Sequence, residues 1–239
     1  MSSIPTVPDA EMLQVDASAA PPPAEQGVDW IEAGGILGQA PCYVAGTHIA
    51  TAGGEMPVEA LSVGDVLVTA HGSGPPLQPV VWVGHRRVSM RRRGNLFARA
   101  PVRIAAGALA DGVPHRDLRV SPDHAMFLDG RLIAAGLLVN GVTIVQEFHH
   151  PEVTYWHVEL PAHGLLVAEG ALSESYLDDG NRGQFDNPSL ITLLMDAVTA
   201  RGTGRYDAAA CFRPLRHGPA LDAIRDRLAL RAEGMRRRA

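Results

Sequence analysis

The chain has 239 residues, of which 46% are hydrophobic and 20% charged, and its formal net charge at pH 7 is −5. This composition supplies enough apolar surface for one large β domain or two smaller domains, which excludes a chain that is disordered throughout. The sequence contains no run of about 18 apolar residues and no basic segment followed by an apolar one at its start, so it predicts neither a membrane span nor a cleaved secretory signal. We therefore expect a cytoplasmic protein, with signal-independent export left open.

Charges and cysteines are distributed unevenly. Residues 1–41 contain acidic but no basic side chains, whereas residues 201–239 are rich in arginine. Flanks of this kind are most often solvated, so they indicate no nucleic-acid partner. Cys42 and Cys211 lie in regions of different composition, which predicts a reducing compartment and no disulfide framework.

The chain divides into three parts by composition. Residues 1–39 are rich in proline and alanine and carry scattered acids, which predicts a flexible tail. Residues 40–185 show short β-type runs separated by turn signals, which predicts an all-β domain. The turn pairs are Gly53-Gly54, Asp129-Gly130 and Asn140-Gly141, each of which predicts a hairpin. The candidate strands are Val66–Thr69, Val80–Val83, Val102–Ala105, Leu118–Val120, Thr154–Leu160 and Leu165–Ala168.

The strand predicted over 154–160 has two different faces, because side chains alternate along a strand. Trp156, Val158 and Leu160 form the apolar face, which we expect to lie in the core. His157 falls on the other face with Tyr155 and Glu159, and we expect it to point away from that core.

Residues 186–239 predict a helical, basic extension. The segment 188–198 resembles a short helix that ends near Gly202. From Pro219 to about Arg237 the apolar residues recur on one face, with arginines at the end where cations favour the helix dipole. This second helix is amphipathic, so we expect it to dock on another surface.

Cys42 is the candidate nucleophile. A free cysteine is commonly a small buried apolar group, but this one follows a proline and a flexible tail, where partial exposure is expected. An unperturbed thiol has a pKa of about 8.5 and needs a neighbouring base or cation to react near neutral pH. The segment Ser121-Pro-Asp-His124 follows a predicted strand and would present a hydroxyl and an imidazole together.

Other polar residues give weaker evidence for a catalytic or metal-binding role. Asp65 and Asp123 lie in predicted turns, where aspartate usually caps its own backbone, so we do not assign them catalytic roles. Four histidines could be imagined as zinc ligands, but they lack paired cysteines or a fixed helical spacing. The sequence therefore predicts no metal site and no cofactor. These histidines are His149, His150, His157 and His163.

The motifs around these residues resemble those of the Hedgehog/intein (Hint) family, in a bacterial branch of it. The segment from Cys42 to Thr51 and its continuation over 56–69 are similar to the first family motif. Residues 116–124 are similar to the second motif, usually Thr-x-x-His, with Ser121 in place of threonine. The remaining matches are Tyr155–Glu159, His163, Leu165–Glu169 and Glu174–Arg182.

The resemblance implies a compact, pseudo-twofold all-β fold and a self-directed reaction. Cys42 would attack the carbonyl carbon of Pro41 in an N-to-S acyl shift that forms a thioester. His124 would polarise the scissile amide and protonate its nitrogen, Ser121 would donate a hydrogen bond, and His163 would assist. The substrate would be the chain's own N-terminal segment, and water or a small thiol would accept the acyl group.

Two departures from the family pattern keep alternatives open. No His-Asn pair precedes a nucleophile at the end of the matching region, because Asn181 is followed by arginine and Asn187 by proline, so splicing is not expected. Pro41 crowds its own carbonyl and should hinder attack by the thiol. The alternatives are a non-cleaving β scaffold that binds a protein partner and, less favoured, a Cys-His hydrolase that acts on other molecules.

Overall fold

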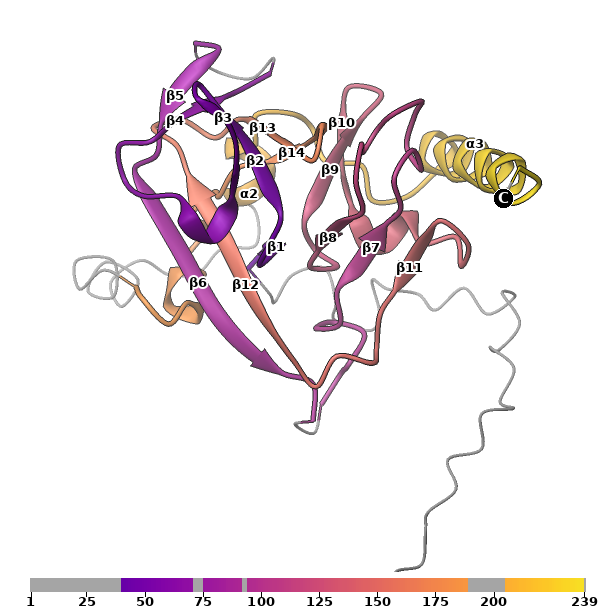
Figure 1. Ribbon diagram of the computed structural model, residues 1–239, viewed down its shortest axis with the longest axis horizontal. Coiled ribbons are helices and arrows are strands. Elements are labelled where there is room, and N and C mark those ends of the chain that lie inside the picture. The colour runs from indigo at the N-terminus through magenta and orange to yellow at the C-terminus, as the bar shows by residue number, and fades with distance from the viewer. Residues whose placement is uncertain (1–39, 71–74, 92–93, 189–204, 239) are drawn as a thin grey trace, which may run out of the picture.

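The computed structural model describes residues 40–70, 75–91, 94–188 and 205–238. Within them the chain is predominantly β, as predicted (Figure 1). The segment 1–39 and most of the helix expected over 188–198 lie outside the described residues. The strands are β1 (Tyr43–Val44), β2 (His48–Thr51), β3 (Gly54–Pro57), β4 (Val66–Val68), β5 (Leu77–Pro79), β6 (Trp82–Ser89), β7 (Val102–Ile104), β8 (Leu118–Val120), β9 (Ala125–Leu128), β10 (Arg131–Ala134), β11 (Ile144–Gln146), β12 (Glu152–Glu159), β13 (Leu165–Ala168) and β14 (Ala171–Glu174).

The strands form two curled antiparallel sheets. The first has the order β11-β7-β8-β1-β12-β6, and the second has the order β10-β9-β14-β13-β2-β4-β5, with β3 paired to β2. The long strands β6 and β12 lie side by side over their full length, from Glu152 opposite Ser89 to Glu159 opposite Trp82 (Figure 1). The short strand β1 lies between β12 and β8. Cys42, the residue before β1, therefore lies at the middle of the first sheet.

The three predicted hairpins have different outcomes. Asp129 and Gly130 both have positive φ angles and join β9 to β10, as predicted. The turn between β2 and β3 lies one residue earlier than expected, at 52–53, because Thr51 pairs with Gly54. The hairpin expected at Asn140-Gly141 is wrong, because β11 pairs with β7 and the residues before the turn form a 3-10 helix over Ala135–Leu138.

The C-terminal region packs back onto the β domain. The short helix α2 (Arg205–Ala209) is followed by a segment that runs beside β10, where Leu132 and Pro214 form a parallel bridge. Helix α3 (Pro219–Arg236) then buries Leu221, Ile224 and Leu228 in the main hydrophobic core. The amphipathic face predicted for α3 is therefore occupied by the chain's own β domain. Among the described helices, none is long and apolar enough to cross a membrane.

Candidate functional site

Cys42 is buried inside the domain, with only 1% of its surface exposed. Its neighbours form a small apolar cluster that includes Val88, Met90, Tyr155 and Phe185. The Sγ atom donates a hydrogen bond to the carbonyl oxygen of Ala40 at 3.3 Å. Burial raises the pKa of the thiol well above its ordinary value, and nearby Arg86 offsets only part of this effect. The thiol is therefore protonated at neutral pH, in contrast to the partial exposure expected from the sequence.

Ser121 joins the two sequence motifs by direct contact. The backbone N–H of Cys42 donates to Ser121 Oγ at 2.8 Å, and the backbone N–H of Ser121 donates to the carbonyl oxygen of Cys42 at 2.8 Å. Both contacts are buried, and they join residues 79 positions apart. The hydroxyl thus accepts a hydrogen bond from the Pro41–Cys42 amide, where the sequence analysis expected it to donate.

His124 is fully buried and its ring packs against Tyr43, the residue after Cys42, with 4.3 Å between the ring centroids. Neither ring nitrogen has a hydrogen-bond partner within the described residues. Burial lowers the pKa of His124 to about 4, although the Glu174 carboxylate acts in the opposite direction. The imidazole is therefore neutral near pH 7 and can both donate and accept a proton.

The position of His157 differs from the one that strand alternation predicts. It was expected to point away from the core, but it is fully buried, with its ring 5.1 Å from that of His124 and 5.8 Å from that of Tyr43. Burial lowers its pKa well below the ordinary value. The curled sheet buries the face of β12 that carries Val153, Tyr155 and His157, whereas Trp156, on the face predicted to lie in the core, is only partly buried. Alternation alone cannot reveal this arrangement.

His163 lies on the second sheet's side of the site, next to a buried carboxylate. Its Nδ1 accepts a hydrogen bond from the backbone N–H of Cys211 at 2.9 Å, and its Nε2 lies 3.5 Å from Glu174 Oε2. Glu174 also accepts hydrogen bonds from the N–H of Ala125, at 2.8 Å, and from the hydroxyl of Tyr206. Burial acts to lower the pKa of His163, but its contacts with Cys211 and Glu174 prevail and raise it to about 9.

The C-terminal segment contributes to this arrangement, which its composition did not predict. Tyr206 and Cys211 reach Glu174 and His163 from a region that composition had marked only as a basic helical extension. No local signal could have revealed these contacts, because they depend on how the segment before α3 runs along β10. The structure thus brings Cys42 and Ser121 into direct contact. His163 lies beside Glu174 and not beside Cys42.

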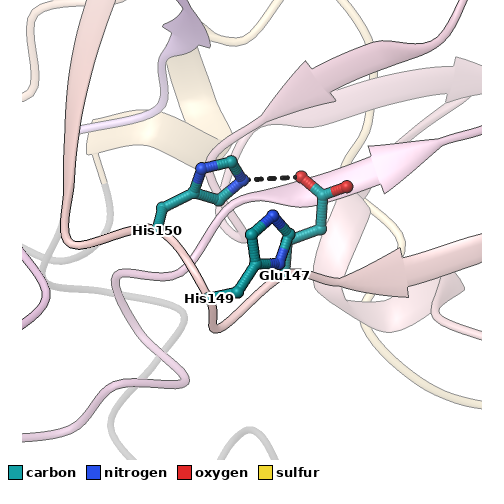
Figure 2. A group of neighbouring side chains, drawn as sticks. All are labelled: Glu147, His149 and His150. Carbon is teal, nitrogen blue, oxygen red and sulfur yellow. Dashed lines mark hydrogen bonds and ion pairs between the residues drawn. The ribbon is translucent and has the colours of Figure 1, made fainter.

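The four histidines considered as metal ligands do not converge. His157 lies beside His124, and His163 beside Glu174. His149 and His150 follow β11 and gather around Glu147, whose Oε2 is 2.9 Å from His150 Nε2 (Figure 2). Arg119 also binds the Glu147 carboxylate, at 3.0 and 3.3 Å. This carboxylate is therefore already engaged by a fixed cation.

The buried histidines predict a maximum of stability near neutral pH. An unfolded histidine has a pKa of about 6.5, so the depressed pKa of His124 stabilises the fold above about pH 6.5. That contribution is lost as the pH falls through about 4, by about 3 kcal/mol in total. The raised pKa of His163 has the opposite sign, so its contribution is complete below about pH 6.5 and is lost as the pH rises through about 9.

Urea denaturation across this pH range would measure the free energy of unfolding and its decrease in both acid and alkali, here called the acid limb and the alkaline limb. Glutamine does not titrate, so His124→Gln should reduce the loss of stability in acid and leave the part that comes from His157. The loss of stability in alkali should be unchanged. His217→Ala, at an exposed histidine, should change neither limb. An acid limb of undiminished slope in His124→Gln would contradict the assignment.

The fold and the buried Cys42–Ser121 contact define a class of protein, namely all-β domains with curled sheets and a cysteine at the entry of the first strand. The family model described as "Hint domain" matches residues 41–180. That match covers more than half of the chain, so the chain belongs to the Hint domain family. No curated protein matches it.

Several solved structures are similar to the chain at low identity. A bacterial intein-like domain from Clostridium thermocellum is 15% identical, with 57% of this chain and 98% of that chain covered and a TM-score of 0.43. A DnaB intein from Synechocystis is 10% identical, with 58% and 100% covered and a TM-score of 0.40. The gp41-1 intein is 15% identical, with 56% and 98% covered and a TM-score of 0.39.

Proposed function

We propose that this chain is an autoprocessing Hint domain, of a bacterial branch of the family, that breaks its own Pro41–Cys42 bond without splicing. The observation that carries the proposal is the buried hydrogen bond from the Cys42 N–H to Ser121 Oγ. It fixes the amide that would be cleaved against the motif that supplies the imidazole. A cysteine with only a packing role does not require this contact.

The proposed reaction has two steps. In the first, Sγ of Cys42 attacks the carbonyl carbon of Pro41, the C–N bond to Cys42 breaks, and the thiol proton ends on the released α-amine. In the second, water or a small thiol attacks the thioester, the C–S bond breaks, and the Cys42 thiol is regenerated. The chain would separate into residues 1–41, carried by the acceptor, and residues 42–239.

Ser121 and His124 would assist the first step in different ways. Ser121 holds the scissile N–H and so fixes the plane of the amide. His124 is neutral and has both ring nitrogens uncommitted, so it can deliver a proton to the departing nitrogen. Positioned acid–base groups of this kind contribute about 10² to 10⁴ in rate. His163, held by Glu174 at 3.5 Å, would tune the charge around His124.

The environment of Cys42 supports a slow reaction that requires deprotonation of the thiol. The raised pKa leaves little thiolate at neutral pH, and Pro41 restricts its own carbonyl. The Sγ–H bond to Ala40 must also break before attack. We therefore expect the rate to rise with pH through the mildly alkaline range.

Two asparagine side chains support a reaction without splicing. The Asn187 amide is held by β6, because its Nδ2 donates to the Val83 carbonyl at 2.8 Å and its Oδ1 accepts from the His85 N–H at 2.9 Å. Asn181 Oδ1 accepts from the Tyr176 hydroxyl at 2.6 Å. The nitrogen of Asn187, which would have to attack its own carbonyl, is therefore engaged by β6, and the Asn181 side chain is oriented through its oxygen.

The second candidate function is a Hint-like β scaffold that binds a protein partner without cleaving. Full burial of the Cys42 thiol and its hydrogen bond to Ala40 favour this alternative. Intact mass of the purified full chain, incubated with and without dithiothreitol, separates the two functions. Release of residues 1–41 on incubation with thiol would support autoprocessing, whereas an unbroken chain after long incubation at mildly alkaline pH would leave the scaffold.

A further inference from the structure

A polar cluster outside the proposed cleavage site lies where β2, β3 and the β13–β14 turn meet the loop before β8. We call it the Glu169 cluster, and it consists of Glu55, His115, Arg116 and Glu169. His115 Nε2 is 3.2 Å from Glu55 Oε1 and 3.5 Å from Glu169 Oε2. One donor atom from each of Glu55, His115 and Glu169 lies within 4.8 Å of the others. Three segments that are distant in sequence thus direct metal-binding atom types at one point.

Glu169 is held in place by its surroundings. Its side chain is 4% exposed, and Oε1 accepts the backbone N–H of His48 at 2.7 Å. Its backbone N–H donates to the His48 carbonyl at 2.9 Å, and its carbonyl accepts the His115 N–H at 2.8 Å. The second oxygen, Oε2, remains directed at His115 and Arg116. A buried carboxylate with a fixed orientation is a preorganised ligand.

Gly170 leaves room for the His115 ring. Its φ angle is +80°, and a Cβ at this position would lie 2.7 Å from His115 Nδ1. Any larger residue would therefore displace the imidazole from Glu55 and Glu169. The turn between β13 and β14 fixes both the carboxylate and the space for the histidine.

Arg116 occupies the position of a bridging cation. Its Nη2 atom lies 2.9 Å from Glu55 Oε2 and 2.8 Å from Glu169 Oε2. The Arg116 side chain is 48% exposed, so it can turn into solvent with the loss of contacts that are worth little at a surface. Two carboxylates face one guanidinium, so the cluster keeps a net negative charge while the histidine is neutral.

In the other histidine–carboxylate group, around Glu147, the carboxylate is held by two arginines. Arg103 Nε lies 3.2 Å and Arg119 Nε 3.0 Å from the Glu147 carboxylate. A divalent ion beside His149 and His150 would find one carboxylate ligand, Glu147 (Figure 2). It would compete for that carboxylate with both guanidinium groups, which also pair with Asp117 at 3.3 and 4.0 Å. Because two guanidinium groups hold the one carboxylate ligand there, whereas one guanidinium is shared by two carboxylates in the Glu169 cluster, the Glu169 cluster is the more favourable cation site.

We propose that the Glu169 cluster binds one divalent transition-metal ion of the Zn²⁺ type through His115 Nε2 and the carboxylates of Glu55 and Glu169, while Arg116 turns into solvent. Imidazole with carboxylate suits Zn²⁺ and its neighbours, whereas Mg²⁺ prefers oxygen ligands and retains its water. His48, whose Nδ1 is 3.3 Å from Glu169 Oε1, orients the carboxylate from behind. The ion would tie the β2–β3 hairpin to the loop before β8 and to the β13–β14 turn.

Isothermal titration of the tag-free full chain with Zn²⁺, with Mg²⁺ as the comparison ion, tests the proposal. We expect one Zn²⁺ per chain and no binding of Mg²⁺. His115→Ala and the nearly isosteric Glu55→Gln should each weaken Zn²⁺ binding by at least ~10-fold. Arg116→Ala should tighten it several-fold, because the competing cation is removed. A merely structural ion-pair network would not produce this gain.

Two control variants and one spectrum separate this site from others. His150→Ala, in the Glu147 group, and His217→Ala, at an exposed histidine, should bind Zn²⁺ like the wild type. Co²⁺ loaded in place of Zn²⁺ should show no thiolate-to-metal charge-transfer band, which excludes Cys42 and Cys211 as ligands. Circular dichroism without metal checks that His115→Ala is folded, and Glu55→Gln repeats the test without the loss of a ring.

Three outcomes would overturn the proposal. The first is the absence of Zn²⁺ binding in both the wild type and Arg116→Ala. The second is binding that survives His115→Ala and Glu55→Gln but is lost in His150→Ala. The third is a thiolate band in the Co²⁺ spectrum.

Discussion

Replacing Cys42 with alanine should leave the chain intact under every condition in which the wild-type chain breaks between Pro41 and Cys42. The methyl group of alanine cannot attack the Pro41 carbonyl, so the thioester cannot form. The Cys42 N–H and its hydrogen bond to Ser121 are kept, and alanine fits the apolar cluster around this position. The loss should therefore be complete without loss of the fold, and intact mass after incubation with dithiothreitol measures it.

Cys211→Ala is the matched control for this experiment, because it removes the other cysteine of the chain. It should still cleave, because the Cys42 thiol is kept and alanine retains the backbone N–H that donates to His163 Nδ1; only the contribution of the Cys211 thiol to the raised pKa of His163 is lost. In the same assay His124→Ala should slow cleavage by ~10² to 10⁴. Cleavage of Cys42→Ala at the wild-type rate would show that another group or a contaminating protease breaks the bond.

Glu174→Ala should lower the free energy of unfolding by about 3–5 kcal/mol, a cost typical of breaking a buried, hydrogen-bonded charge pair. Glu174 is 1% exposed and accepts hydrogen bonds from the Ala125 N–H and the Tyr206 hydroxyl, with His163 Nε2 at 3.5 Å. Alanine would leave these polar groups buried without their acceptor. Urea denaturation near neutral pH measures the change.

Two further variants calibrate that measurement. Glu174→Gln keeps one acceptor oxygen and should cost less than Glu174→Ala. Glu152→Ala removes a half-exposed carboxylate that pairs with exposed Arg87 at 3.4 Å, and such surface pairs contribute about 0–1 kcal/mol. Equal losses in Glu174→Ala and Glu152→Ala would mean that the buried carboxylate does not hold the C-terminal segment to the domain.

The two proposals concern different parts of the molecule and fail independently. Autoprocessing depends on the Cys42–Ser121 contact in the first sheet. The metal site depends on Glu169, in the turn between two strands of the second sheet. A chain that binds Zn²⁺ but does not cleave would support the scaffold function for the first site and leave the second proposal intact.

Local sequence determined the features that depend on neighbouring residues. Alternating apolar runs and turn pairs predicted the β architecture, and Asp129-Gly130 forms the hairpin that its positive φ angles favour. The helix from Pro219 was predicted to within one residue at its end, because its apolar residues recur with the helical period. The motifs at 42–51 and 116–124 predicted the family, which the match over residues 41–180 confirms.

Tertiary structure alone decided what each polar side chain contacts. Two-residue alternation placed His157 opposite the apolar face, but the curled sheet covers that side of β12 as well, so the ring is buried beside His124 while Trp156 on the apolar face stays partly exposed. The link from Tyr206 to Glu174 and the convergence of Glu55, His115 and Glu169 join segments that are distant in the chain. Such contacts depend on strand order and register, which no local pattern encodes, because periodicity specifies which face a residue takes and not which segment covers it.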